Sequence, residues 1–489
     1  MRDLVFAAYL LGLIGLALKR PFLLLRVYAY IDIVSPQRLS YFLLNAIPIS
    51  AITFALAFGA WLLVDDKADS RFSWRQIIMC VLLVWCGYTT LHADFPIEAT
   101  AKWDWVWKSL VFAIFLPLTL RTKLRIEALA LTLVLCASSI IVTGGIKTAL
   151  SGGGYGVLNL MVENNSGLYE SSIISTVAIA IIPLILWLAK HGTIFPPGRA
   201  VRLYAFALCG ACLLIPVGTE ARTGLLCIAM LIGMMLLHSE RRILYGAGIA
   251  AAALIAIPFL PSSFTSRMNT IESYQSDTSA STRLAVWQWT WDYAKQHPGG
   301  GGFDAYRSNS FTYDMMQDTG TPTAPRIERV RVTDKARAYH NSYFEVLGEQ
   351  GYFGFALWML LQIVSLGRTT AIYRRYRRDP ASDKAWIAPL ALALMQGHLV
   401  YLLGAMFVGI AYQPFVFMLL AMQIGLSTYL ARKRWEEEHT PIFGKPPLSD
   451  DVLPKYGKRV DPGGKSNVPA GQPTGVMGGK RDRHPIIDV

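Results

Sequence analysis

The chain alternates between long apolar runs and short polar connections. Thirteen runs are apolar enough to form membrane helices, a structure that needs roughly 17–25 residues. They cover residues 4–18, 22–34, 42–64, 76–91, 105–120, 126–146, 169–189, 203–217, 222–238, 243–260, 345–366, 386–407 and 411–430. The first two are short and fit a tilted, re-entrant or hairpin arrangement, which leaves 12 or 13 spans. The runs lack the alternation of barrel strands. The pattern therefore predicts an all-α polytopic integral membrane protein.

Charge adds an orientation to this picture. Only 16% of the 489 residues are charged, against about a quarter in soluble proteins, and the net charge is +13. The positive clusters fall in alternate connections, as cytoplasmic loops require. They are Lys19-Arg20, Arg121 to Arg125, Lys190 with Arg199 and Arg202, Arg241-Arg242, Arg374 to Arg378, and Arg432 to Arg434. Because they are scattered between spans, no nucleic-acid partner is predicted.

The order of spans and connections divides the chain into four regions. Residues 1–261 form an N-terminal transmembrane bundle whose first span is retained rather than cleaved as a signal peptide. Residues 262–344 form one large loop on the outer side, 345–430 carry the C-terminal transmembrane helices, and 431–489 form a disordered basic cytoplasmic tail. A connection as long as 262–344 indicates a functional segment.

A tryptophan-rich helix is predicted inside this loop. The stretch "STRLAVWQWTWDYAKQHP" starts with Ser281 or Thr282 as a cap and stops at Pro298. Leu284, Trp287 and Trp291 share one face, which predicts an amphipathic helix at the lipid interface.

The cysteines, glycine-rich stretches and histidines do not indicate a cofactor site. All six cysteines lie in apolar spans, so we interpret them as packing residues. The glycine stretches "SGGGYG" (151–156) and "PGGGGFD" (298–304) lack the ending of a nucleotide-binding loop and are interpreted as flexible turns. The eight histidines show no ligand spacing, so neither a metal nor a cofactor is predicted.

Three polar residues stand at the outer ends of spans or in the large loop. Arg222 opens a span in "GTEARTGLL". A helix N-terminus and a guanidinium together favour binding of an anion. A snorkelling arginine that marks the membrane interface explains the position of Arg222 equally well. Arg283 opens the tryptophan-rich helix. His340, in "ARAYHNSYFEVLGEQG", can accept a proton near neutral pH.

These segments carry a resemblance to a known family. "AYHNSYFEVLGEQGYFG" resembles the histidine signature of the O-antigen ligase and polymerase superfamily, and "STRLAVWQW…HPGGGGFDAYR" and "GTEARTGLL" are similar to two further motifs of it. The family often has Ser before the arginine where this chain has Ala221. "MRDLVFAAYL" and "YAYIDIVSPQRLSY" resemble, more narrowly, O-glycosylation ligases associated with exosortase systems.

The resemblance implies a membrane glycosyltransferase of the architecture called GT-C in the bacterial inner membrane. Such an enzyme transfers a glycan from undecaprenyl diphosphate to an acceptor on the periplasmic side, which here would be lipid A core, a polysaccharide or a protein hydroxyl. It implies that Arg222 and Arg283 contact the diphosphate and that His340 is the catalytic base, with inversion and without a metal. Accessory site candidates are Arg337, Tyr339, Asn341 and Glu349. Glu349 could instead be the ion-pair partner of an arginine at the mouth of the span.

Other functions remain open at this stage. A polymerase of the same superfamily differs only in its acceptor. A transporter would place paired ionisable groups in mid-span, whereas the candidates here lie at outer ends. A membrane scaffold would explain the tryptophans but not the two arginines with a histidine.

Overall fold

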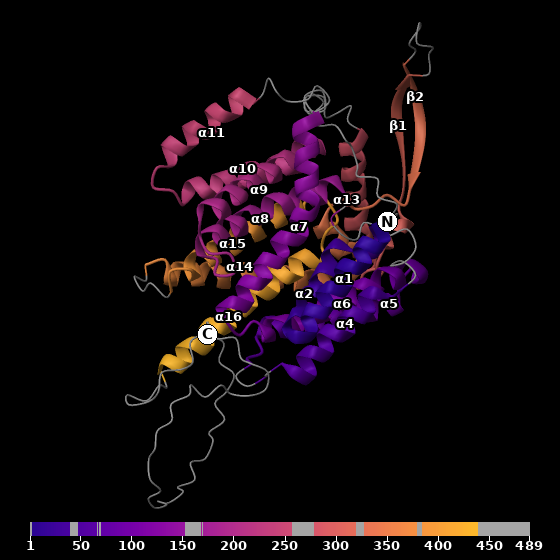
Figure 1. Ribbon diagram of the computed structural model, residues 1–489. Helices are drawn as coiled ribbons and strands as arrows, with labels where there is room; N and C mark the ends of the chain where they lie inside the picture. The colour runs from indigo at the N-terminus through magenta and orange to yellow at the C-terminus, as the bar shows by residue number, and fades with distance from the viewer. Residues whose placement is uncertain are drawn as a thin grey trace, which may run out of the picture.

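The described residues form a bundle of membrane helices from which a β-hairpin protrudes (Figure 1). The computed structural model describes residues 2–39, 47–65, 67, 70–151, 168, 170–256, 278–318, 327–378 and 384–438. The predicted disordered tail, 431–489, is wrong at its start, because the last helix continues to Glu438. Residues 439–489, most of "SGGGYG" and the first part of the large loop lie outside the described residues.

A helix occupies each of the thirteen predicted spans. The helices are α1 (Arg2–Lys19), α2 (Leu24–Val34), α4 (Ile49–Gly59, followed by a π turn at Ala60–Val64), α5 (Trp74–Leu91), α6 (Pro96–Thr119), α7 (Lys123–Ser151), α8 (Ser171–His191), α9 (Arg199–Gly218), α10 (Arg222–Leu237), α11 (Arg242–Ala256), α14 (Ser342–Tyr376), α15 (Ile387–Gly404) and α16 (Pro414–Glu438). A short α3 (Pro36–Leu39) follows α2.

Seven of these helices are long and apolar enough to cross a membrane: α5, α7, α8, α9, α14, α15 and α16. The apolar parts of α1, α4 with its π turn, α10 and α11 are shorter. The all-α polytopic fold class is therefore confirmed, while the full count of 12 or 13 spans stays a prediction.

The centre of the bundle is formed by α8 and α16. In each, 83% of the apolar window is buried against other helices, while α9 and α14 bury only 28%. Membrane helices associate through close packing of small residues rather than through exclusion of water. At Gly397 of α15, for example, a Cβ atom would meet the carbonyl oxygen of Ala180 at 2.5 Å, so only glycine allows α8 and α15 to approach this closely.

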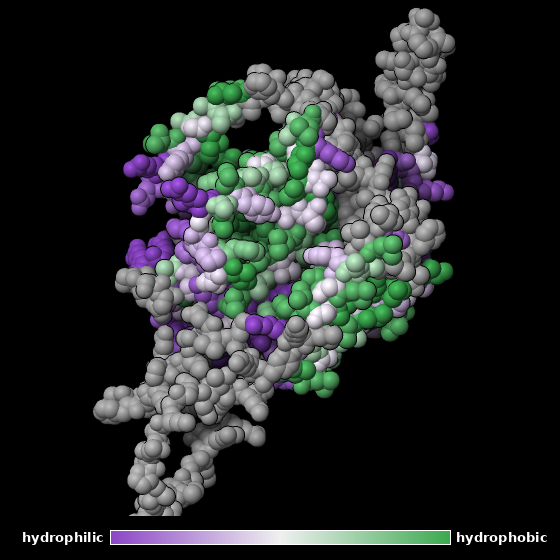
Figure 2. Space-filling view, viewed as in Figure 1, coloured by the Kyte–Doolittle hydropathy of each residue, from purple (hydrophilic) through white to green (hydrophobic). Residues whose placement is uncertain are grey.

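The two ends of the bundle differ in charge. The helices α6, α8, α10, α14 and α16 begin, and α5, α9 and α15 end, at what we call the cavity end. The opposite end, here the basic end, carries Arg121, Lys123, Arg125, Lys190, Arg199, Arg202, Arg241, Arg242, Arg374, Arg375 and Arg432. In Figure 2 hydrophobic residues cover broad areas of the helix flanks, and hydrophilic residues gather at the left edge, near the junction of α10 and α11.

The large loop contains a helix and a hairpin. Helix α13 (Thr278–Gln296) ends just before Pro298, as predicted, but it begins upstream of Ser281 and Thr282, so neither residue caps it. Strands β1 (Ser310–Asp318) and β2 (Ile327–Lys335) pair antiparallel, with Ser310 opposite Lys335, and protrude from the bundle (Figure 1). The sequence reading had not anticipated this hairpin.

The prediction that Leu284, Trp287 and Trp291 all face lipid is wrong for Trp287. Leu284 and Trp291 are exposed at 61% and 48%. Trp287, by contrast, donates a hydrogen bond from Nε1 to the carbonyl oxygen of Tyr339 (2.9 Å) and stacks on Phe344 with ring centroids 5.4 Å apart. The helix therefore turns Trp287 toward the protein, and this contact docks α13 onto the segment that carries His340.

Candidate active site

A cavity of about 420 Å³ opens at the cavity end of the bundle. Its wall comes from four parts of the chain: the start of α6, the turn at 304–307, the segment 338–340 that leads into α14, and the connection 408–413 between α15 and α16. Glu170, the N-cap of α8, completes the rim, and its Oε2 accepts a hydrogen bond from the backbone N–H of Ile173 (2.8 Å).

His340 lines this cavity and is exposed to it. It has a left-handed backbone conformation with φ of 45°, an arrangement that costs free energy for a side chain other than glycine and concentrates at functional sites. The pKa of His340 is lowered from its ordinary value of 6.5 by partial burial and by the positive charges of Arg283 and Arg337. A lowered pKa keeps the imidazole neutral, the form that can accept a proton.

The structure brings Arg283 close to His340, but it does not bring Arg222 to the cavity. Arg283 is half-buried in α13, near enough to influence the imidazole charge. Arg222 opens α10 at the same end of the bundle. The adjoining Thr219 hydrogen-bonds Ser175 in the second turn of α8 (3.0 Å), and Arg222 is not among the residues that line the cavity.

The accessory candidates fall into different environments. Arg337 points its guanidinium at Asp334 of β2, with Nη2 2.6 Å from the carboxylate. Tyr339 is buried and lines the cavity. Asn341 is the N-cap of α14, because its Oδ1 accepts hydrogen bonds from the backbone N–H groups of Tyr343 (2.9 Å) and Phe344 (3.3 Å). Capping accounts for the Asn341 oxygen without a substrate.

Glu349 is paired with a lysine, not with an arginine as the alternative reading had expected. Lys102 of α6 places Nζ 2.8 Å from Oε1 of Glu349 and 2.8 Å from Oε1 of Glu345. Asp304 lies 3.8 Å from the same nitrogen. The Glu349 side chain has no exposed surface, and that of Lys102 is only 14% exposed. One ammonium group thus pairs with two buried carboxylates and lies near a third, which offsets part of the cost of burying them.

Sequence reasoning missed Lys102 because it assigned residues 92–104 to an outer loop. Helix α6 instead begins at Pro96, which puts Lys102 inside its second turn. The available signal was a lysine beside "WDWVW" on the side of the membrane where the positive-inside rule does not require positive charge.

A second missed residue, Arg307, follows the glycine-rich turn. It lines the cavity, with guanidinium nitrogens 3.5 Å from Glu98 and 3.8 Å from Asp304. Burial raises the pKa of Asp304, and the charges of Lys102 and Arg307 oppose that effect. Its position in "GGFDAYR", next to the predicted turn, was the signal that could have found it.

The turn at 298–304 is packed rather than flexible. The backbone N–H of Gly301 donates to the carbonyl oxygen of Gly348 (3.0 Å), and that of Tyr352 donates to Pro298 (3.0 Å). Helix α14 kinks at Gly351, whose φ is 62°, and a Cβ there would meet the Pro298 oxygen at 2.1 Å. Glycine is needed at this position both for its conformation and for the close approach.

The charge of the cavity is mainly negative. Its lining includes five carboxylates (Glu98, Glu170, Asp304, Glu345 and Glu349) but only two permanent cations (Lys102 and Arg307). Among the described residues, no group of three or more histidines, cysteines or acids is arranged to hold a metal ion. The three innermost carboxylates are already gathered around the Lys102 ammonium group.

Comparison with protein families gives this geometry a context. Residues 204–359 match the family described as O-antigen ligase. The match supports the O-antigen ligase superfamily. It covers His340, both candidate arginines and Glu349, whereas Lys102 and Glu98 lie in residues 1–193, which match a family of unknown function (DUF5935). No curated protein matches the chain. The cavity of the ligase-like segment is thus completed by side chains of the preceding segment.

Proposed function

We propose that the protein is a glycosyltransferase of the inner bacterial membrane that transfers a glycan from an undecaprenyl-diphosphate carrier to an acceptor hydroxyl on the periplasmic side. The observation that carries the proposal is His340, which faces a cavity at the end of the bundle opposite the basic residues and has Arg283 beside it. The family match supports a ligase or polymerase of this superfamily.

The side of the membrane follows from charge. Cytoplasmic connections are enriched in Lys and Arg, so the basic end is assigned to the cytoplasm and the cavity end to the periplasm. A lipid-linked donor that has been flipped across the membrane would present its glycan at that level, which suits a cavity at the helix ends.

The chemistry divides between a base and cations. Neutral His340 takes the proton of the acceptor hydroxyl, whose oxygen attacks the anomeric carbon as the bond from that carbon to the phosphate oxygen breaks. The electron pair leaves with the diphosphate, and direct displacement inverts the anomeric centre. General base catalysis of this kind contributes about 10²- to 10⁴-fold in rate. Arg283 stabilises the charge that develops on the diphosphate, and Arg222 is the second proposed contact.

The negative charge of the cavity favours one arrangement of the substrates. Acidic side chains outnumber the permanent cations in this cavity, which disfavours a diphosphate there, so the diphosphate belongs on the Arg283 side of His340. The acceptor occupies the cavity, where carboxylates can accept hydrogen bonds from sugar hydroxyls. Tyr306 offers an aromatic ring there and packs edge to face on the buried Tyr339, with ring centroids 5.6 Å apart.

The test is transfer by the purified protein in lipid, supplied with an undecaprenyl-diphosphate glycan and candidate acceptors. His340→Ala and Arg283→Ala should abolish product at unchanged protein abundance, and Arg222→Ala tests the second contact separately. Lys295→Ala, which removes an exposed cation of the same helix, is the matched control and should keep activity. Transfer by His340→Ala at the wild-type rate would refute the proposal.

The same assay separates the two members of the superfamily. A ligase gives one glycan joined to a distinct acceptor. A polymerase gives a ladder of longer glycans on the lipid carrier when the donor is the only substrate. The candidate acceptors are a lipid A core, a polysaccharide and a protein hydroxyl.

A further inference from the structure

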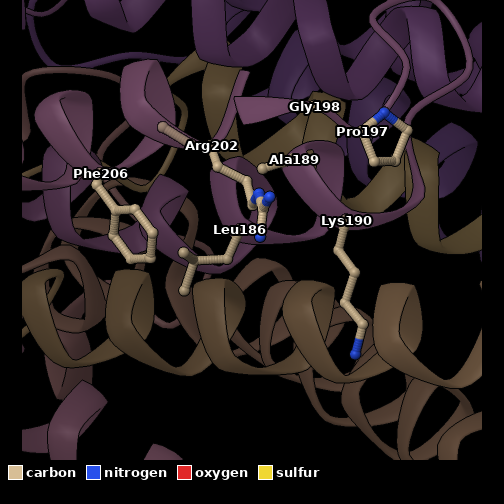
Figure 3. A pocket seen from close by; sticks show the side chains of 8 residues that line it. Leu186, Ala189, Lys190, Pro197, Gly198, Arg202 and Phe206 are labelled. Carbon is tan, nitrogen blue, oxygen red and sulfur yellow. The ribbon is translucent and has the colours of Figure 1, made fainter. Parts of the chain in front are cut away.

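A second cavity, of about 450 Å³, lies at the basic end of the bundle. It is lined by the last two turns of α8, the connection 192–198 and the first two turns of α9 (Figure 3). It is therefore remote from the His340 cavity, which lies where α8 begins. Nothing in the proposed transfer reaction uses it.

The connection that forms one wall of this cavity is held in a fixed shape. Glu127 of α7 is 1% exposed. Its Oε1 accepts hydrogen bonds from the backbone N–H groups of Thr193 (2.6 Å) and Ile194 (2.7 Å), and its Oε2 accepts one from the Thr193 hydroxyl. Pro196 and Pro197 follow. A wall fixed in advance reduces the entropy that a ligand must lose on binding.

The charged side chains of this cavity both favour an anion. Its lining contains Lys190 and Arg202 and no acidic residue. Neither cation forms a salt bridge with the part of the chain that the structure describes. Helix α9 begins beside them, with Gly198 as its N-cap and no side chain capping it, so its first N–H groups add positive potential.

The remaining wall is apolar. In Figure 3 the guanidinium of Arg202 lies beside Leu186 and Ala189, Phe206 stands one turn further along α9, and the Lys190 side chain extends away from Arg202. On the outer flank of α9, Leu203 and Phe206 are exposed at 73% and 67%. An apolar surface of this kind on a membrane helix faces acyl chains.

We propose that this cavity binds the phosphate group of an anionic phospholipid from the leaflet at the basic end. The phosphate accepts hydrogen bonds from Arg202 and lies at the start of α9, Lys190 attracts it from the rim, and the acyl chains run along Phe206 and Leu203. A combination of two cations with apolar walls fits a lipid better than a free phosphate, which has no apolar part. This inference is independent of the glycosyltransferase proposal.

The experiment measures lipid bound to the full-length protein in a neutral detergent by native mass spectrometry. Phosphatidylglycerol is the probe and phosphatidylcholine the zwitterionic comparison. We expect wild-type protein to retain phosphatidylglycerol preferentially and Arg202→Gln to bind it about tenfold more weakly, a difference of about 1.4 kcal/mol. Lys190→Gln should have a smaller effect, because its amine extends away from Arg202.

Arg241→Gln is the matched control. Arg241 is exposed at the same end of the bundle but outside this cavity, so its removal should leave binding unchanged. Thermal unfolding of each variant verifies that it is folded. Equal binding by wild type and Arg202→Gln, or an equal loss in Arg241→Gln, would overturn the proposal. Displacement of phosphatidylglycerol by millimolar inorganic phosphate would overturn the lipid assignment in favour of a free anion.

Discussion

Replacing Lys102 by methionine should destabilise the protein far more than replacing a lysine with the same ion-pair distance on the surface. Lys102 Nζ lies 2.8 Å from carboxylate oxygens of both Glu345 and Glu349, whose side chains are 9% and 0% exposed. Lys295 Nζ also lies 2.8 Å from its partner Asp292, but both of these side chains are about half exposed. The two pairs therefore differ in burial and not in distance.

The magnitude follows from what the substitution leaves behind. Removal of one partner of a buried ion pair costs about 3–5 kcal/mol, because the remaining charge stays desolvated without compensation. In Lys102→Met two carboxylates and the nearby Asp304 would lose their common cation, so we expect a loss of about 4 kcal/mol in the free energy of unfolding. In Lys295→Met the carboxylate is solvated, and no measurable change is expected.

The assay is reversible unfolding in mixed micelles with increasing denaturing detergent, followed by tryptophan fluorescence. A second substitution makes the test specific to the ion pair. Lys102→Met combined with Glu349→Met removes one of the stranded charges, so the double variant should be more stable than Lys102→Met alone. Equal stability losses in Lys102→Met and Lys295→Met, or no recovery in the double variant, would refute the account of the buried network.

Three further predictions concern the two cavities. His340 acts as a base only when neutral and its pKa is lowered, so the acid limb of the pH profile of kcat/KM should lie below pH 6.5. Arg337→Gln removes a positive charge that lowers the pKa of His340, so it should move this limb to higher pH. Because acidic side chains line the cavity, acceptors that end in a neutral sugar should have a higher kcat/KM than those that end in a uronic acid. Glu98→Gln removes one of these acids and should reduce the ratio of the two kcat/KM values about twofold to fivefold. Glu127→Ala should lower the free energy of unfolding by about 1.5–3 kcal/mol in the micelle assay, because the backbone N–H groups of Thr193 and Ile194 lose the charged acceptor that the buried Glu127 provides.

The membrane helices could be predicted because each apolar run carries its own signal. The ends of the helices could not. The sequence placed residues 92–104 in a loop because Glu98, Lys102 and Asp104 interrupt the apolar run. Helix α6 includes all three, since the charge of Lys102 is neutralised by Glu345 and Glu349, more than 240 residues away in the chain. Partners at that separation leave no mark on local hydropathy.

The β-hairpin was missed for a different reason. Strands β1 and β2 lie in the polar loop, outside the apolar runs that predict the membrane fold. Their sequences, "SFTYDMMQD" and "IERVRVTDK", hold β-branched and aromatic residues between polar ones, a pattern typical of strands. Its two strands are separated by only eight residues in the chain. The hairpin could therefore have been predicted from the local sequence.

The candidate site shows the same division between local and distant signals. His340 and Arg283 were found because each stands in a distinctive local motif, and the structure brings them together through Trp287 and Tyr339. Arg222 stands in an equally distinctive motif, yet it does not line the cavity. A motif indicates which residue type a family uses, but convergence depends on packing between helices that the motif does not contain.

The buried lysine explains why the cavity needs both matched segments of the chain. Lys102 belongs to the N-terminal segment, while Glu345 and Glu349 belong to the segment that matches O-antigen ligases. Both glutamates lie in the first turns of α14, directly after His340. The ammonium group of Lys102 therefore fixes α6 against the start of α14 and, through Asp304, against the packed glycine turn. Part of the cavity wall depends on this contact, so the ligase-like segment alone would carry the histidine but not the complete cavity that it faces.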